Sequence, residues 1–489
     1  ILVQAFVAAF RKPIIKSLGF AVTFIELLSL KRRWNWVTRV TRATPYALTV
    51  IGIIIFITGA CTSWHNKMAT FKLFGGKNIG EVEHELTNKG HAELYIPINR
   101  LAFSIYANKL AAKQITQLIH AAKDVRVDSC SYRSSNIVLI IGESYGRHHS
   151  QQYGYFMKTT PRQAALEKSR KLTKFTDVVT CWNLTSFVFK NVFSTHVVGE
   201  KGDWCDYPLF PELFRKAGYQ VTFITNEFLP QAKEAVYDFS GGFFLNNPEL
   251  SKLQFDNRNT ELHPLDDGLL DDYDNHLKQK QGEHNLIIFH LMGQHVDYKS
   301  RYRKEQTEFW AGNYEDKRPE LNAKQRKMLS HYDNATLYND SIVAQIVKRF
   351  EKEDAIIIYM PDHGEECYEE NRGFICRNHS AAIDWPLAHY EFEIPFWIYC
   401  SRKYIRKHRD IYKQIRKAKD RRYMTDALPH LLLYLAGIET PTYQAKYNIL
   451  SPEYDEMRPR ILKNSADYDK LRDEHIAKEK KANEKKKGK

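Results

Sequence analysis

Two short polar segments, far apart in the sequence, each follow an apolar run and carry residue types that bind divalent metals. Asp362 and His363 come directly after the run Ala355–Met360. Glu143 follows the run Asn136–Ile141 after one glycine. Each run is long enough for a buried strand and too short for a helix, and open α/β sheets bind ligands at the carboxyl ends of their strands. A carboxylate beside an imidazole suits a divalent transition metal, so we expect a metal site formed by these side chains.

Thr185 lies between the two strands and could supply a nucleophile. With Asn183 and Ser186 it precedes an apolar run, which is the pattern of a helix N-terminus. The free N–H groups of a helix N-terminus hold phosphate groups, and a hydroxyl on a metal loses its proton more readily. A threonine that only caps the helix is the alternative for this residue.

A third apolar run, Asn285–Phe289, ends in a segment with two histidines, His290 and His295. A histidine after a strand is often an ordinary loop residue. Here both histidines would emerge at the sheet edge that already carries three candidate ligands. We therefore favour a role for them in binding a metal or substrate.

From about residue 136 to residue 438, apolar strand-like runs alternate with helix-like segments. This alternation predicts an α/β domain whose sheet is covered by helices on both faces. The expected strands are Asn136–Ile141, Tyr219–Thr225, Asn285–His290, Ala355–Met360 and Ile394–Tyr399. The expected helices are Glu212–Lys216, Tyr332–Phe350 and Thr425–Leu435.

Tyr46–Ser63 is almost entirely apolar and carries no charged residue, so it could just span a bilayer. A buried helix is the alternative. Basic residues cluster at positions 31–42, which predicts that this side faces the cytoplasm and that the chain after the span lies on the far side. Ile14–Leu30 is a weaker candidate span. Because the sequence begins with Ile1 rather than methionine, we expect that part of the membrane region is missing.

Residues 66–130 are expected to connect the membrane region, residues 1–65, to the catalytic α/β domain, residues 131–470. Within this connection Asn99–Val125 has apolar residues at helical spacing, which predicts an amphipathic helix. Packing of the helix on the α/β domain is the favoured use, and a position along the membrane surface is the alternative.

The chain has 489 residues and a formal net charge of +14. Its basic residues gather in Arg402–Arg422 and in the tail Lys478–Lys489. Nucleic-acid binding would require a basic face interleaved with aromatic residues or a known module. The sequence has neither, so we expect no nucleic-acid partner, and anionic lipid headgroups would explain the clusters equally well. Residues 471–489 have almost nothing to bury, which predicts a disordered tail.

Seven cysteines are too few for a disulfide framework. Cys367 and Cys376 flank the loop after the strand Ala355–Met360, and Cys181 and Cys205 bracket the expected helix N-terminus. Either pair could form a disulfide if this part of the chain lies outside the cytoplasm. The odd number leaves at least one thiol free.

The chain contains five motifs in order: Gly142-Glu143-Ser144, the Cys181-X-X-X-Thr185 spacing, Met292-Gly293-Gln294-His295, the segment Tyr332 to Asp340, and Asp362-His363-Gly364-Glu365. Together they resemble the phosphoethanolamine transferases of Gram-negative envelopes, which belong to the alkaline phosphatase/sulfatase superfamily. The resemblance runs from the membrane segment to about Ile438. It implies an alkaline-phosphatase/sulfatase-like central sheet with helices on both faces, preceded by a transmembrane helix or helices.

The resemblance implies a zinc-dependent transfer through a covalent phosphothreonine. Thr185 would be the nucleophile that carries the phosphoethanolamine group. Glu143, Asp362 and His363 would bind Zn²⁺ together with the Thr185 oxygen. The donor would be phosphatidylethanolamine, and the acceptor would be the lipopolysaccharide core or lipid A.

The resemblance also implies further residues around the phosphate. His295 would bind the phosphate of the substrate or a second metal. The family has another histidine in the loop after the Asp-His pair, for which His379 is the first candidate and His389 the alternative. Asn183 and Lys190 lie near the nucleophile and are assigned to the phosphate from proximity alone.

One departure from the family pattern bears on the acceptor. Lipid A enzymes have a second cysteine ten residues after the first, and here that position is Asn191. This difference places the chain nearer the lipopolysaccharide-core branch than the lipid A branch. A membrane-anchored phosphodiesterase or other headgroup transferase of the same superfamily is the alternative function. Either enzyme would lie in the bacterial inner membrane with its catalytic domain in the periplasm.

Overall fold

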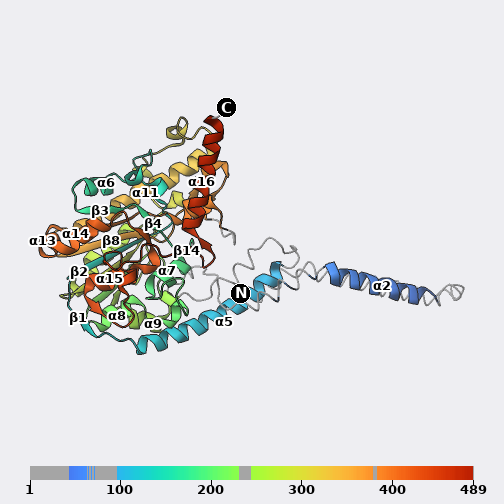
Figure 1. Cartoon of the computed structure of the whole chain (residues 1–489), viewed down its shortest axis with the longest axis horizontal. Coiled ribbons are helices and arrows are strands. Elements are labelled where there is room, and N and C mark those ends of the chain that lie inside the picture. The colour runs from blue at the N-terminus through green and yellow to red at the C-terminus, as the bar shows by residue number, and fades with distance from the viewer. Residues whose placement is uncertain are drawn as a thin grey trace. The chain divides into compact units, whose positions relative to one another are not determined.

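The computed structural model of the chain describes residues 43–62, 64, 68, 71, 96–230, 244–377 and 383–487. The chain forms two compact units, Ile1–Ala107 and Asn108–Lys489. The candidate site residues that the structure describes belong to the larger unit. This unit is built around a mixed β-sheet (Figure 1).

A seven-stranded sheet with the strand order β3-β11-β8-β2-β7-β5-β6 lies at the centre of the larger unit. β2 pairs in parallel with β7 and β8, whereas β11 runs antiparallel to both of its neighbours. The strands are β2 (Asn136–Gly142), β3 (Leu172–Phe175), β5 (Gln220–Thr225), β6 (Asn257–Arg258), β7 (Asn285–His290), β8 (Ala355–Pro361) and β11 (Phe396–Cys400). The carboxyl ends of β2, β7 and β8 therefore meet at one edge of the sheet.

The five strands expected from the sequence are present, each within two residues of its predicted bounds. The sequence did not predict β3 and β6, because runs of four and two residues carry no recognisable periodicity. Short two-stranded sheets flank the main one: β1 (Ser129–Cys130) with β13 (Ile438–Glu439), β4 (Asp177–Val179) with β12 (Arg422–Met424), β9 (Glu366–Cys367) with β10 (Ile375–Cys376), and β14 (Ile461–Leu462) with β15 (Ala466–Asp467).

Helices cover both faces of the central sheet (Figure 1). On β2, Val138 and Ile140 belong to the same buried cluster as residues of α10 (Asp267–Asp272) and α11 (Ala323–Phe350). The alternate residues of β2 point the other way and are also buried, and α15 (Leu428–Ala436) packs against this strand. Burial on both faces explains why the strands are unbroken apolar runs in the sequence.

The expected helices form, with somewhat different bounds. α11 begins earlier than predicted because Asn322 caps it: the Asn322 side chain accepts a hydrogen bond from Gln325 N, and the Gln325 side chain accepts one from Asn322 N. α15 ends at Ala436, and its C-cap residue Gly437 has a left-handed backbone (φ 75°) that suits glycine. Further helices are α6 (Pro161–Lys168), α7 (Thr185–Phe193), α8 (Phe210–Lys216), α9 (Pro248–Gln254), α12 (Trp385–Phe392), α13 (Arg402–Lys407) and α14 (Arg409–Ala418).

The N-terminal part of the described chain has two long helices, α2 (Ala43–Thr62) and α5 (Ile96–Lys123). α5 confirms the helix expected in the connecting region, and its Ala111 is buried in the larger unit. α2 covers most of the apolar segment Tyr46–Ser63. Among the described residues, no helix combines the length and the apolar character that crossing a membrane requires. The weaker candidate Ile14–Leu30 lies outside the described residues.

Residues 471–487, for which the sequence predicts disorder, lie in the helix α16 (Tyr468–Lys487). The first turn of this helix is anchored because Tyr468 is buried and its hydroxyl donates to Glu393. Beyond that turn the sequence is rich in Ala, Glu and Lys, which favour a helix even where little is buried. The low burial expected from composition is present, but it does not prevent the helix.

All seven cysteines are free thiols, including those of both pairs considered above. In the β9–β10 hairpin Cys367 pairs with Ile375, whereas Cys376 pairs with Glu366. Neighbouring residues of a strand point to opposite faces, so Cys367 and Cys376 face opposite sides of the hairpin. This register explains why the two thiols are not bonded to each other.

Asp426 and Arg458 form a buried ion pair that holds the C-terminal segment to the rest of the domain. Arg458 donates from both terminal nitrogens to Asp426, each at 2.8 Å. We expect Arg458→Met to lower the free energy of unfolding by about 3–5 kcal/mol, because the Asp426 carboxylate then stays buried without its partner. Thermal unfolding of the purified protein measures the change. The control Lys446→Met removes an exposed pair with Glu200 and should cost at most about 1 kcal/mol, so equal losses would contradict the prediction.

Candidate active site

Parallel pairing of β2 with β8 brings Glu143 and Asp362 together. Gly142 pairs with Pro361 at the ends of the two strands, and Asp362 N donates to Gly142 O at 2.9 Å. Glu143 and Asp362 are therefore the first residues beyond the paired strands. The sequence predicted this placement from the two apolar runs.

Glu143, Asp362 and His363 form a fully buried cluster. One ligand atom from each lies within 4.8 Å of the others. His363 Nε2 lies 3.0 Å from Asp362 Oδ2 and 3.6 Å from Glu143 Oε1. The three residue types predicted as metal ligands thus converge on one small volume.

Hydrogen bonds behind the cluster leave lone pairs facing its centre. Asp362 Oδ1 accepts from the N–H groups of Ser144 at 3.0 Å and His363 at 2.7 Å, while Oδ2 receives no hydrogen bond within the described residues. His363 Nδ1 lies 2.8 Å from Gly364 O, so Nδ1 carries the proton and Nε2 keeps its lone pair. A divalent cation could bind Oδ2 and Nε2 in this buried site, in place of the Arg377 N–H group that lies 2.8 Å from Nε2.

Burial dominates the electrostatics of the cluster. It raises the pKa of Glu143, which the nearby Asp362 carboxylate raises further, and it also raises the pKa of Asp362. Burial lowers the pKa of His363 to about 3, with a further contribution from Arg377, so the imidazole is neutral. A cation would offset these effects, because it stabilises the ionised carboxylates and accepts the imidazole lone pair.

Thr185 is the first residue of α7, and its hydroxyl faces the cluster. Its Oγ1 lies 3.2 Å from Glu143 Oε2 and 3.4 Å from His363 Nε2. Leu184 is the N-cap residue, and no side chain caps this helix, so the alternative of a capping threonine is wrong. The hydroxyl lies where a nucleophile activated by a metal would have to be.

Arg377 is a residue of the site that sequence reasoning missed. Its Nη1 lies 2.8 Å from His363 Nε2, 3.5 Å from Thr185 Oγ1 and 3.6 Å from Glu143 Oε1. The residue follows β10, in a loop whose sequence matches none of the motifs. No local pattern could have identified it, because only the return of the β9–β10 hairpin brings its guanidinium to the cluster.

The histidines predicted around the phosphate differ in position. His295 is half-buried, and the residue before it, Gln294, donates from its backbone N–H to Glu143 O at 3.2 Å, so His295 follows directly on a contact with the Glu143 loop. His379 lies outside the described residues. The alternative His389 belongs to a separate group of side chains, in which its Nδ1 lies 2.8 Å from Glu393 Oε1.

Asn183 is buried just before α7, and Lys190 is buried within this helix. Each side chain has partners of its own. Asn183 Nδ2 donates to Glu391 at 2.7 Å. The Lys190 ammonium lies 4.8 Å from the centroid of the Phe187 ring, a cation–π contact. Their contact with a phosphate stays a prediction.

His290 ends β7 and joins a second group of buried ligand atoms. Its Nδ1 lies 3.0 Å from Thr225 Oγ1, and its Nε2 lies 3.6 Å from Glu227 Oε2. Glu143 also belongs to this group, in which the three ligand atoms lie within 4.8 Å of one another. Glu227 carries no motif, so its position was not predicted from the sequence.

Two motif glycines allow the loops around the cluster to pack closely. Gly293 has a left-handed backbone (φ 47°), and a Cβ there would lie 3.0 Å from backbone atoms of Glu143. At Gly364 a Cβ would overlap the carbonyl oxygen of Tyr390. Any larger residue at either position would push a loop away from the cluster.

The sulfatase family model matches residues 135–438, which is more than half of the chain. The chain belongs to the sulfatase family. Its larger unit has the alkaline-phosphatase/sulfatase-like α/β fold built on a central mixed sheet. The motif residues of the candidate site all lie within the matched part of this sulfatase-family chain.

Phosphoethanolamine transferase EptC of Escherichia coli O18:K1:H7 (strain RS218 / NMEC) is 31% identical over 333 residues, which are 67% of this chain and 55% of the relative. Kdo(2)-lipid A phosphoethanolamine 7''-transferase of Escherichia coli (strain K12) is 25% identical over 293 residues, 58% of this chain and 48% of the relative. The crystal structure of the C-terminal periplasmic domain of EcEptC from Escherichia coli, in complex with Zn, is 28% identical with a TM-score of 0.60, covering 71% of this chain and 96% of that one. The chain spans about half the length of these curated relatives.

The converging ligands predict that the purified protein contains a divalent transition metal. Asp362→Asn should lose most of the metal held at this site, because a carboxamide is a weaker ligand than a carboxylate. Elemental analysis measures the metal content per chain. Asp272→Asn is the matched control, since Asp272 also pairs with a histidine, His263, at 2.7 Å but belongs to no ligand group among the described residues. Full metal content in Asp362→Asn would contradict the site.

Proposed function

We propose that this chain is a zinc-dependent phosphoethanolamine transferase that moves the group from phosphatidylethanolamine to an envelope glycolipid. The observation that carries the proposal is the Thr185 hydroxyl facing Glu143 and His363 in the buried cluster. Membership of the sulfatase family and a relative named phosphoethanolamine transferase support it.

The donor set of the cluster suits Zn²⁺. Glu143, Asp362 and His363 would hold the ion together with the Thr185 oxygen. These residues supply nitrogen and oxygen ligands, in the number that zinc prefers. The zinc in the crystal structure of the EptC domain supports this choice. When bound, the ion lowers the pKa of the hydroxyl and neutralises charge on the phosphate.

Thr185 would attack the phosphorus atom of the donor headgroup. The Oγ–P bond forms, the bond from phosphorus to the diacylglycerol oxygen breaks, and that oxygen gains a proton equivalent to the one that Thr185 loses. An acceptor hydroxyl then attacks the phosphothreonine and restores the threonine. Phosphoryl transfer also needs positively charged groups that bind the non-bridging oxygens of the phosphate. Arg377, 3.5 Å from Thr185 Oγ1, is positioned to bind them.

The proposed acceptor is lipopolysaccharide, and its core is favoured over lipid A as the part that is modified. Asn191 stands where lipid A enzymes have a cysteine, and its side chain donates to Phe187 O at 2.8 Å within α7. The relative named for lipid A is also less similar, at 25% identity against 31% for EptC. His295 and His379 are the proposed further contacts of the phosphate or of a second metal.

The proposed location is the bacterial inner membrane, with the catalytic domain in the periplasm. Basic residues at positions 31–42 precede the apolar segment Tyr46–Ser63, so the positive-inside rule places the chain after that segment outside the cytoplasm. The matched EptC domain is named periplasmic, which supports the same side. Donor headgroup and glycolipid acceptor would meet on that face of the membrane.

Thr185→Ala should abolish transfer and leave the fold in place. Without the hydroxyl no phosphothreonine forms, and the rate should fall on the order of 10³-fold or more. Mass spectrometry of envelope glycolipids from cells expressing each variant measures the added phosphoethanolamine. Transfer near the wild-type level by the alanine variant would show that Thr185 is not the nucleophile.

Two further variants serve as controls for this prediction. Thr185→Ser keeps a hydroxyl at the cluster and should retain measurable transfer. Ser186→Ala removes the neighbouring hydroxyl and should leave transfer within a few-fold of wild type. Release of phosphoethanolamine into water without glycolipid modification would favour the hydrolase alternative instead.

The location predicts the behaviour of fusions made after residue 70 of the full-length protein. An alkaline phosphatase fusion there should be active, because that enzyme needs the oxidising periplasm. A green fluorescent protein fusion exported by the general secretory route should be dark. The opposite pattern would place the catalytic domain in the cytoplasm and exclude the proposed acceptor.

A further inference from the structure

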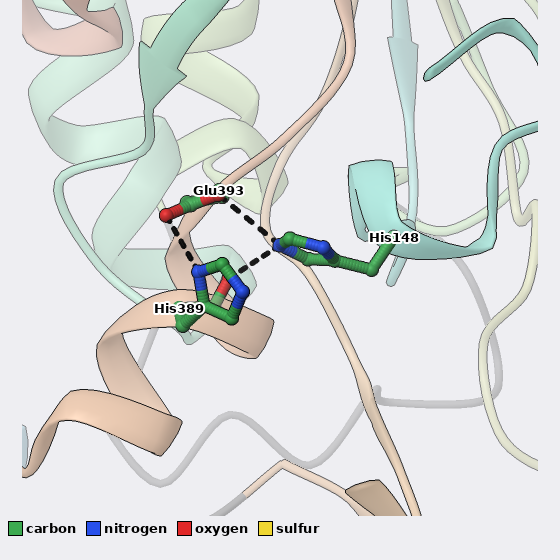
Figure 2. A group of neighbouring side chains, drawn as sticks. All are labelled: His148, His389 and Glu393. Carbon is green, nitrogen blue, oxygen red and sulfur yellow. Dashed lines mark hydrogen bonds and ion pairs between the residues drawn. The ribbon is translucent and has the colours of Figure 1, made fainter. Parts of the chain in front are cut away.

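We propose that His148, His389 and Glu393 form a second, peripheral site for a divalent transition metal such as Zn²⁺. The three residues are separate from the candidate active site, and their ligand atoms lie within 4.8 Å of one another. Figure 2 shows both imidazole rings directed at the Glu393 carboxylate. Two imidazoles and one carboxylate are a ligand set that zinc takes in proteins.

Two segments far apart in the sequence form this site. His389 on α12 and Glu393 at its C-cap are four residues apart, which places them on one helix face. His389 Nδ1 lies 2.8 Å from Glu393 Oε1. His148, in the turn Arg147–His149 after β2, brings its Nε2 to 3.1 Å from Glu393 Oε2 and 3.0 Å from the His389 carbonyl oxygen. An ion among these atoms would replace the imidazole–carboxylate hydrogen bonds with metal–ligand bonds.

Glu393 has two other partners that hold its carboxylate in place. Arg147 forms an ion pair with Oε2, and the Tyr468 hydroxyl donates to Oε1. These contacts also describe an ion-pair network without metal, which is the alternative for the group. In metal sites, however, ligating carboxylates are commonly oriented by such outer partners. Only a metal site would bind zinc, so zinc binding distinguishes the metal site from the ion-pair network.

The site is open to solvent, as entry of a hydrated ion requires. A pocket of about 550 Å³ is lined by His389 and Glu393, among other residues. The side chains of His148 and His389 are 24% and 26% exposed. Trp385 stacks on the His389 ring at 5.0 Å between centroids, which limits the orientations of this imidazole. The ligands are therefore held in place while the pocket leaves positions for water or a further ligand.

A metal here would tie α12 to the turn Arg147–His149, which follows Glu143 in the chain. His475 lines the same pocket and stacks on Trp385, with ring centroids 5.1 Å apart, but it is not in the ligand group. It therefore provides a matched control: a histidine in the same pocket whose loss should not affect metal binding.

The test counts zinc bound by the full-length protein, purified in detergent and dialysed against buffered micromolar zinc. His148→Ala should bind one equivalent less than wild type, and His475→Ala should bind the same amount as wild type. The same loss of one equivalent should appear when His148→Ala is added to an Asp362→Asn background, which separates the peripheral site from the active site. Equal zinc content in wild type and His148→Ala would overturn the proposal.

A second measurement covers the case in which the variant is less well folded. Zinc should raise the thermal unfolding temperature of Asp362→Asn, and this rise should disappear when His148→Ala is added. Transfer activity of His148→Ala should stay near wild type, since the residue does not touch the proposed reacting atoms. A zinc-dependent rise that survives in the double variant would also overturn the proposal.

Discussion

Buried negative charge at the ends of β2 and β8 is the constraint on which the site depends. Glu143 and Asp362 are fully buried, and moving a carboxylate out of water costs on the order of several kcal/mol even after relaxation. Asp362 Oδ2 also lies only 3.0 Å from the unprotonated His363 Nε2. Positive charge therefore has to enter the cluster, and the Arg377 guanidinium and a divalent cation can both supply it. The same charge would stabilise an alkoxide at Thr185, so the burial that destabilises the cluster also prepares the nucleophile.

Parallel strands are a suitable support for such a cluster because their ends cannot separate easily. β2 is paired on both sides and buried on both faces, and the bond from Asp362 N to Gly142 O extends the pairing to the first residue of the site. The cluster is then closed by loops that approach within van der Waals contact. Gly293 and Gly364 permit this approach, so the two glycines act on the site through packing rather than chemistry.

The strands and the Glu143–Asp362–His363 cluster could be predicted because a short apolar run followed by a polar residue is a local pattern. Features that depend on tertiary contacts could not. A capping threonine and a nucleophile have the same local sequence at Thr185, and only the position of α7 against the sheet distinguishes them. Arg377 has no local pattern at all, and the tail helix α16 depends on an anchor that composition does not reveal. The spacing of Cys367 and Cys376 likewise does not reveal the register of β9 and β10, which directs the two thiols to opposite faces.

The chain after the family match is connected to the site through buried polar contacts. The match ends at residue 438, yet Arg460 is buried and pairs with both Asp177 and Asp469. One residue before Asp469, α16 begins with the tyrosine that donates to Glu393, and Glu393 pairs with Arg147 in the turn that leaves β2. The C-terminal helix is thereby linked to the loop that carries the first carboxylate of the cluster. A metal bound at Glu393 would strengthen this link, because it would join α12 to the same turn through bonds that water does not readily replace.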